Sequence, residues 1–253
     1  MRVREIMSRT VLTKTGIEGY SYCINPYVGC QHGCRYCYAS FMKRFTGHSE
    51  PWGEFVDVKI NAPQVLARQL KRPKEGSVLI GTVTDPYQPL EKKYRITQGC
   101  LEALLKSPLS LNILTRSPLA VRDIDLFNKL HDIKIGFSIT TDSEETKKLF
   151  EPNAPSILSR VEALRKTHDA GISTYVFIGP MLPLDPKKIV DMVAGAADSV
   201  LIDRLNYSNK VLSIYRRHGL ENFLSHDYFS STGLELKEKF EKRDIPVSIF
   251  FAE

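Results

Sequence analysis

With 253 residues, the chain is long enough to form one large domain or two small ones around a real hydrophobic core. Its residues are 42% hydrophobic and 25% charged, which is ordinary for a soluble globular protein. No apolar run reaches the length of a membrane span, and the N-terminal sequence MRVREIM lacks the pattern of a signal peptide. We therefore expect a cytoplasmic protein without a membrane partner.

The net charge is +6, from 35 Lys and Arg against 29 Asp and Glu. Such a balance favours a polyanionic partner such as a nucleic acid. Because the basic residues are scattered and form no long tract, a basic surface without such a partner fits equally well.

Strands and helices alternate along most of the chain. The stretch 20–25 predicts a first strand that leads into a loop, 38–47 a short helix, 54–60 a strand and 62–71 a helix. From residue 77 onward the pattern is regular. Strands are predicted at 77–82, 111–115, 134–139, 174–178 and 199–203, and helices at 97–106, 123–130, 143–149, 155–169, 186–197 and after 208. Residues 1–19 carry no clear pattern.

This alternation predicts βαβ units and a parallel sheet. Five or six repeats fit either an incomplete (β/α) barrel or a doubly wound sheet, and in a barrel the chemistry lies in the loops after the strands. We predict a core over 1–205, with a cluster loop at 25–40, and a C-terminal extension over 206–253. The extension has an amphipathic helix at 234–241 and a last strand at 245–250, and we expect it to cover the barrel mouth.

The stretch 29–39 (GCQHGCRYCYA) holds three of the five cysteines, spaced C-x-x-x-C-x-x-C. Its glycines and the preceding Asn25-Pro26 indicate a loop, which can wrap three thiolates around one centre. Thiolates select zinc, Cu(I) or an iron–sulfur cluster, and three of them leave one coordination position open. A zinc site completed by His32 is the alternative, although structural zinc sites usually contain a second Cys pair, which is absent from this sequence. The odd cysteine count argues against a disulfide framework.

The motif G-C-x-x-x-C-x-Y-C-Y-A resembles the signature of the radical S-adenosylmethionine (SAM) superfamily, in the form of its spore photoproduct lyase-like branch. The resemblance implies a [4Fe–4S] cluster on Cys30, Cys34 and Cys37, with SAM on the open iron. It also implies reductive cleavage of SAM to methionine and a 5′-deoxyadenosyl radical, and a reductant such as ferredoxin or flavodoxin. The superfamily fold is a partial (β/α)6 TIM-like barrel, which decides against the doubly wound alternative.

Polar residues follow the predicted strands where a SAM molecule would lie. After the strand at 77–82, Thr84 and Asp85 offer acceptors for an ammonium group, although both are also common in turns. The resemblance assigns them to the methionine amino group. Arg116 follows the next strand and could pair with a carboxylate, and the resemblance assigns it to the methionine carboxylate. By the same resemblance Ser138 contacts the cofactor, and Ile178 lies against the adenine, or is simply part of the core.

Two tyrosines flank the third cluster cysteine, as they do in the spore photoproduct lyase-like branch. The resemblance implies that Tyr36 contacts the cofactor and that Tyr38 relays the radical, while packing is the ordinary role of such residues. Glu151 and Arg160 resemble a Glu-Pro…Arg element of this branch. Glu151 could bind ribose hydroxyls, but a structural pair with Arg160 is the stronger interpretation.

The sequence leaves the substrate open. Thr82 stands where the branch has a hydrogen-donating cysteine and carries no transferable S–H, which argues against the photoproduct reaction itself. The excess of basic residues fits a radical enzyme that acts on a nucleic acid base, either as a DNA repair lyase or as an RNA-modifying enzyme. A radical enzyme acting on a peptide or small molecule is the second reading, weakened because no cysteine follows Cys100 to bind an auxiliary cluster. A zinc-binding module without catalytic activity is the third.

Overall fold

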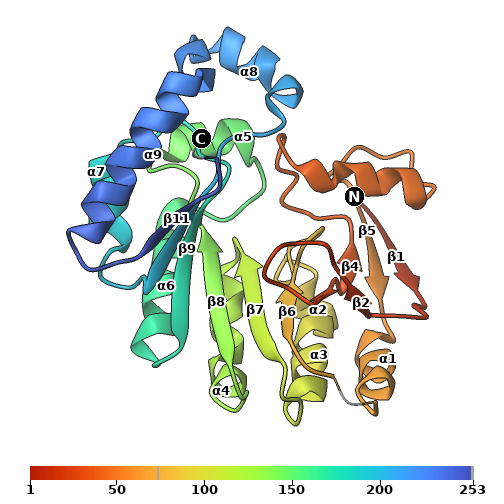
Figure 1. Ribbon diagram of the computed structural model, residues 1–253. Helices are drawn as coiled ribbons and strands as arrows, with labels where there is room; N and C mark the ends of the chain where they lie inside the picture. Colours follow the sequence, from red (N-terminus) through yellow and green to blue (C-terminus); the bar gives the residue numbers. More distant parts are fainter. Residues whose placement is uncertain (73, 252–253) are drawn as a thin grey trace.

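The computed structural model describes residues 1–72 and 74–251, and an open, mostly parallel eight-stranded sheet forms its centre (Figure 1). The strands are arranged in the order β11-β10-β9-β8-β7-β6-β3-β2. Only β2 runs antiparallel to its neighbour. The bounds of the eight strands are β2 Leu12–Lys14, β3 Tyr22–Ile24, β6 Ser77–Ile80, β7 Ser110–Thr115, β8 Ile133–Ser138, β9 Ser173–Ile178, β10 Ser199–Ile202 and β11 Val247–Ile249. The six parallel strands β3 and β6–β10 confirm the predicted partial (β/α)6 barrel, and the sheet does not close.

Helical segments connect the strands and extend beyond the last repeat. The α-helices are α1 Ala62–Gln69, α2 Glu91–Tyr94, α3 Ile96–Leu104, α4 Ile124–Phe127, α5 Glu144–Phe150, α6 Ile157–Asp169, α7 Pro186–Val193, α8 Leu212–Arg217 and α9 His226–Glu241. The 3-10 helices are η1 Tyr38–Phe45, η2 Pro118–Asp123, η3 Ser208–Lys210 and η4 Glu221–Leu224. No helix in the described part of the chain is both long and apolar enough to span a membrane.

A second, three-stranded sheet lies beside the barrel at the end opposite to α9 (Figure 1). It consists of β1 Arg2–Ile6, β5 Phe55–Lys59 and β4 Tyr27–Val28. The strand predicted at 54–60 is thus confirmed, but it lies outside the barrel sheet. β1 escaped prediction because it is a polar edge strand with little buried surface. The pair β4–β5 matters for function, since β4 leads directly into the cysteine loop.

Alternation along the parallel strands sorts side chains into two sets. Val78 and Ile80 of β6 are fully buried in the core, whereas Leu79 between them lines a cavity inside the barrel. In β9, Ile178 belongs to the buried core set and Phe177 lines the cavity. This follows from the two-residue period of a strand.

The predicted elements are confirmed with shifted ends. The predicted helix at 234–241 is the second half of α9, which begins at His226, where the Ser225 hydroxyl accepts a hydrogen bond from the Tyr228 backbone N–H at 3.1 Å. The helix predicted at 123–130 is shorter, because Asp123 belongs to the 3-10 helix η2 and α4 already ends at Phe127. The C-terminal strand β11 pairs in parallel with β10 and so extends the main sheet.

Candidate functional site

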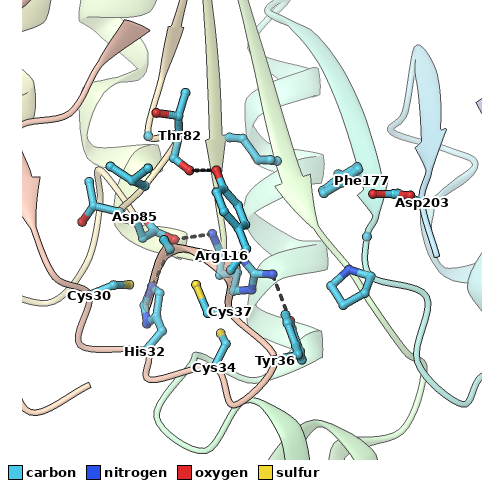
Figure 2. A pocket seen from close by; sticks show the side chains of 18 of the residues that line it. Cys30, His32, Cys34, Tyr36, Cys37, Thr82, Asp85, Arg116, Phe177 and Asp203 are labelled. Carbon is cyan, nitrogen blue, oxygen red and sulfur yellow. Dashed lines mark hydrogen bonds and ion pairs between the residues drawn. The ribbon is translucent and has the colours of Figure 1, made fainter. Parts of the chain in front are cut away.

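The cysteine loop follows β4 and places its three thiols near one another. Figure 2 shows the sulfur atoms of Cys30, Cys34 and Cys37 gathered below the ends of the barrel strands. The turn into the loop requires Gly29, which has φ +90°, and a Cβ there would lie 2.4 Å from the Phe55 carbonyl oxygen. The sequence therefore bends the chain by a backbone conformation that other residues rarely adopt.

Two neighbouring loops hold the cysteine loop in place. On one side, the Thr84 hydroxyl donates to the Gly29 carbonyl oxygen at 2.6 Å, and the Gln31 backbone N–H donates to the Gln88 side-chain oxygen at 2.9 Å. On the other side, the Arg35 backbone N–H donates to the Phe150 carbonyl oxygen at 2.9 Å. The loop is thus fixed between the segment that follows β6 and the end of α5.

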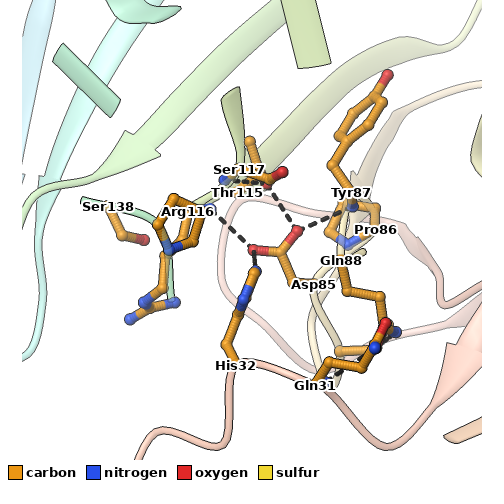
Figure 3. A network of polar contacts seen from close by, with 12 residues as sticks. Gln31, His32, Asp85, Pro86, Tyr87, Gln88, Thr115, Arg116, Ser117 and Ser138 are labelled. Atoms are coloured by element: carbon orange, nitrogen blue, oxygen red, sulfur yellow. Dashed lines mark hydrogen bonds and ion pairs between the residues drawn. The ribbon is translucent and has the colours of Figure 1, made fainter. Parts of the chain in front are cut away.

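Asp85 is a buried acceptor for groups that surround the cysteine loop (Figure 3). One oxygen accepts from the Thr115 hydroxyl (2.6 Å) and the Tyr87 N–H (2.8 Å), and the other from the Arg116 N–H (2.8 Å). His32 Nε2 lies 3.1 Å from this second oxygen. Burial alone would raise the pKa of Asp85, but His32 and these hydrogen bonds lower it to about 2.

These bonds occupy both predicted ligands of the SAM amino group. Both carboxylate oxygens of Asp85 are engaged, and the Thr84 hydroxyl also accepts from the Gln88 amide nitrogen at 3.0 Å. In this geometry the two residues position the cysteine loop and His32. Direct contact with an ammonium group stays a prediction that requires some of these bonds to rearrange.

Glu151 is the centre of a second buried network. Its carboxylate accepts from Arg160 Nη2 at 2.5 Å, from Arg116 Nε at 3.1 Å and from the Thr140 hydroxyl at 3.0 Å. The Tyr36 hydroxyl also donates to it. Burial would raise the pKa of Glu151, but Arg160 and Arg116 hold it well below its usual value. The predicted structural pair of Glu151 with Arg160 is present. The Glu151 side chain is fully buried, so a contact with ribose hydroxyls is absent from this geometry.

A cavity of about 420 Å³ opens above the three cysteines. Its volume lies within the range of small-molecule sites. The cysteine loop, the segment Gly81–Asp85 and Arg116 form one wall, and Phe177 and Asp203 stand on the opposite one (Figure 2). Arg116 uses Nε for Glu151 and Nη2 for the Tyr36 hydroxyl (3.0 Å), and its Nη1 makes no hydrogen bond with the described residues. A free N–H donor at the cavity wall suits an anionic group such as a carboxylate.

Tyr38 reaches the end of β6 from the other side of the cavity. Its hydroxyl donates to the Thr82 carbonyl oxygen, and its ring stacks on Tyr207, with ring centroids 6.5 Å apart. Burial raises the pKa of Tyr38 to about 12, so the phenol is neutral. Tyr36 differs, because its hydroxyl is tied to Glu151 and Arg116.

The remaining sequence predictions fare differently. Strand alternation turns Ile178 into the core and puts Phe177 on the cavity wall, so a contact between Ile178 and an adenine stays a prediction. Ser138 lies in register with Phe177 on the neighbouring strand. It does not line the cavity, although its hydroxyl is buried and has no partner in the part of the chain that the structure describes.

Sequence reasoning missed Asp203, Tyr207 and Phe177 on the cavity wall. Asp203 follows β10 as Asp85 follows β6, so the rule that polar residues follow the strands could have found it. Burial raises the pKa of Asp203, and its carboxylate accepts from the Asn206 side-chain amide at 3.0 Å. Phe177 could have been found from the alternation of β9.

The donor set fits an iron–sulfur cluster. Burial raises the pKa of all three thiols, that of Cys34 to about 12, so binding iron must displace protons. His32 lines the cavity beside them, and its Nδ1 is buried without a partner among the described residues. A bound cluster and its ligand would supply a hydrogen-bond partner at this position.

The same thiols do not form a single-ion site. Zinc–thiolate bonds of 2.3 Å in a tetrahedron bring sulfur atoms within roughly 3.8 Å of one another. Among residues 1–72 and 74–251, no three His, Cys, Asp or Glu side chains are grouped to hold one metal ion. In a cluster each cysteine binds a different iron, so wider spacing is expected.

The comparisons with known proteins agree with this site. A family model, Radical SAM superfamily, matches residues 24–196. An uncharacterized protein of Methanocaldococcus jannaschii is 36% identical over 72% of this chain and 69% of its own length. The Radical SAM Nalpha-GlyT isomerase of Pseudomonas phage M6 is 24% identical over 72% of this chain and 35% of its own.

Among solved structures, spore photoproduct lyase complexed with dinucleoside spore photoproduct is similar in fold. The TM-score is 0.74 with 15% sequence identity, over 98% of this chain and 82% of that one. Another structure of this lyase contains AdoMet together with the dinucleoside, with a TM-score of 0.67.

The open barrel, its cysteine loop and the cavity define an enzyme with a partial (β/α) barrel. The chain belongs to the radical SAM superfamily. The cofactors of this family are a [4Fe–4S] cluster and SAM, and its enzymes need a reductant.

Proposed function

We propose that this chain is a radical SAM enzyme that acts on a nucleic acid base. The observation that carries the proposal is the aromatic lining of the cavity that faces the cysteine loop. Tyr38, Trp52, Phe177 and Tyr207 all line it. Proteins recognise unstacked bases by stacking them on aromatic side chains, at about 1–3 kcal/mol per base.

Asp203 adds a polar group to this aromatic wall. It stands with Phe177 across the cavity from the cysteines (Figure 2). A carboxyl group there can accept a hydrogen bond from a base amino or imino group. Aromatic faces with one carboxyl group suit a flat heterocycle better than an extended peptide.

Two further observations support a nucleic acid substrate. The net charge of +6 favours polyanions. Spore photoproduct lyase, which is similar in fold, is complexed with dinucleoside spore photoproduct in its solved structure. The hydrogen-donating cysteine of that branch is replaced by Thr82, so we expect a reaction different from photoproduct cleavage.

When bound, the cluster and SAM supply a 5′-deoxyadenosyl radical that abstracts hydrogen from a substrate. Cys30, Cys34 and Cys37 would hold the cluster, and the free Nη1 of Arg116 would bind the methionine carboxylate. Tyr38 is the phenol beside the Thr82 carbonyl, where it can give a hydrogen atom to a substrate radical.

The proposal is tested by measuring which compounds stimulate SAM cleavage. Anaerobically reconstituted protein with dithionite and SAM is mixed with single-stranded DNA, with tRNA or with a peptide mixture, and 5′-deoxyadenosine is measured. We expect a nucleic acid to raise its formation at least tenfold above the background without substrate. If only the peptide mixture stimulated SAM cleavage, the proposal would be wrong and the enzyme would be a peptide-modifying one.

Tyr38→Phe tests the phenol within the same assay. We expect at least a tenfold loss of nucleic-acid-stimulated turnover, while cleavage without substrate stays within threefold of wild type. Tyr94→Phe is the matched control, because it also removes a hydroxyl bond, to Glu5 at 3.0 Å, but does not line the cavity. Equal behaviour of the two variants would exclude a special role for Tyr38.

A further inference from the structure

A second pocket reaches the cysteine loop by another route. It has a volume of about 390 Å³ and shares two lining residues, Cys34 and Trp52, with the main cavity. The C-terminal segment contributes Lys210 and Arg217, and the cysteine loop contributes Arg35. The pocket therefore connects a cluster cysteine to the surface without crossing the rest of the cavity.

This pocket is strongly basic. Arg35, Lys210 and Arg217 line it, and none of its described lining residues is Asp or Glu. Arg35 and Arg217 are exposed, and neither side chain forms a hydrogen bond or ion pair with the described residues. Arg243, which is also exposed, does pair, with Asp191 at 2.5 Å. Unpaired like charges around one hollow repel one another and favour an anionic partner.

Lys210 joins the basic pocket to the cysteine loop itself. Its Nζ donates to the Cys37 carbonyl oxygen at 2.7 Å and to the Ser40 hydroxyl at 2.6 Å. The indole nitrogen of Trp52 is buried without an acceptor among the described residues. The pocket is thus built on the backbone that carries the cluster ligands, and a partner bound there contacts the loop directly.

We propose that this basic pocket is the docking site of an acidic electron-carrier protein of the flavodoxin or ferredoxin type. The inference rests on the proposed function, because each reductive cleavage of SAM takes one electron from the cluster, which must then be reduced again. One electron leaves the reduced carrier and reduces the oxidised cluster by one electron, and no covalent bond forms or breaks. Cys34 offers the short path, since it lines both hollows.

A nucleic acid phosphate would meet the same charges, but the carrier fits better. The aromatic groups that would stack a base lie in the other cavity, and Trp52 is the single aromatic residue lining this pocket. Approach from this side also leaves the substrate cavity free during reduction. The two occupants are distinguished in the test.

The test compares Arg217→Glu with Arg216→Glu in cluster-loaded protein. Both changes reverse an exposed charge on α8, but Arg216 does not line the pocket. Cluster reduction is followed by anaerobic stopped-flow absorbance with purified, reduced flavodoxin, or with reduced methyl viologen, a small cation. Equal iron content and circular dichroism establish that both variants fold and load.

We expect Arg217→Glu to slow reduction by flavodoxin at least tenfold at low ionic strength, and Arg216→Glu to slow it less than threefold. The difference should shrink in high salt, and reduction by methyl viologen should not slow. Equal rates of both variants with flavodoxin would overturn the inference. So would a loss of oligonucleotide affinity in Arg217→Glu without a slower flavodoxin reaction, which would identify a phosphate site.

The outcomes separate this inference from the proposed function. Suppose that nucleic acid stimulates SAM cleavage by wild-type protein reduced with methyl viologen, but that flavodoxin reduces Arg217→Glu as fast as Arg216→Glu. Then only the docking site fails. If nucleic acids do not stimulate SAM cleavage with any reductant, the proposed substrate fails, whereas the reduction kinetics still report on docking.

Discussion

Glu151 gives the sharpest test of the buried network beside the cysteine loop. Glu151→Gln keeps the size of the side chain and removes its charge. Arg160, which is also fully buried, then loses its anionic partner and faces neutral acceptors, among them the carbonyl oxygens of Ser138 and Pro155 at 3.0 and 2.9 Å. Breaking one partner out of a buried ion pair costs about 3–5 kcal/mol. Because these carbonyls partly compensate Arg160, we expect a loss near the lower end, about 3 kcal/mol.

The assay is urea unfolding of the metal-free protein, followed by circular dichroism. A loss of about 3 kcal/mol corresponds to roughly 6–12 °C in Tm for a chain of this size. Glu145→Gln is the matched control, since Glu145 is exposed on α5 and makes no bond to the described residues. It should change the unfolding free energy by less than about 0.5 kcal/mol. A loss below about 1 kcal/mol in Glu151→Gln would refute the reasoning.

The pH dependence has a defined sign. The pKa of Glu151 in the folded protein is lower than in the unfolded chain, because Arg160 and Arg116 outweigh the effect of burial. Its stabilisation is therefore complete above the unfolded pKa and is lost as pH falls through the folded one. The gap between wild type and Glu151→Gln should stay constant from about pH 6 to 8 and narrow as pH falls below about 4.3, where the unfolded chain takes up a proton that folded Glu151 does not.

Three further predictions concern other parts of the structure. Gly136→Ala should destabilise by about 1–3 kcal/mol in urea unfolding, because its Cβ would lie 2.0 Å from the Tyr175 ring, which is held by a 2.6 Å bond to Asn112. Gly195→Ala, with nothing within 4 Å of its Cβ, should change little, and equal losses would contradict the clash. The pKa of Asp85 is lowered to about 2, so its carboxylate should add about 2 kcal/mol to the unfolding free energy above pH 4, and this part should be lost as pH falls toward 2. Asp85→Asn should remove this part of the acid dependence of the unfolding free energy. An unchanged pH profile in the variant would contradict the prediction. Cys34→Ala should abolish iron loading in anaerobic reconstitution, whereas Cys100→Ala, a buried core cysteine on α3, should load normally; iron content and absorbance decide, and a brown Cys34→Ala protein would contradict the ligand assignment.

The strands and helices of the barrel could be predicted from the sequence because each repeat has a recognisable local pattern. Buried strands such as Ser77–Ile80 are followed by amphipathic helices, and the two periods differ clearly. The choice of a barrel over a doubly wound sheet came from the cysteine motif rather than from the pattern. β1 could not be found, because its polar residues pack on an edge formed by a distant strand, β5.

The site could be predicted by position but not by contact. Residues after the strand ends do line the cavity, as Thr84, Asp85 and Arg116 show. Their hydrogen bonds depend on His32 and Glu151, which lie elsewhere in the chain, so no local pattern reveals that these side chains are already engaged. Phe177, one residue before Ile178, lines the cavity because successive side chains of a strand point to opposite faces.

The Lys210 contact with the cysteine loop lay beyond any sequence signal. Its position depends on how the segment after β10 returns across the loop, and nothing around residue 210 marks a partner near Cys37. The division at residues 205 and 206 stays a prediction. The segment beyond it supplies Tyr207 to the cavity and Lys210 to the basic pocket, and its last strand joins the main sheet.

Reductive cleavage of SAM is the central claim, and one measurement tests it most directly. The protein is reconstituted anaerobically with iron and sulfide, reduced with dithionite and supplied with SAM, and its metal content and products are determined. The account predicts a brown protein that contains iron and forms 5′-deoxyadenosine and methionine, and that loses both properties in Cys34→Ala. A colourless protein that takes up zinc and forms no 5′-deoxyadenosine would contradict it.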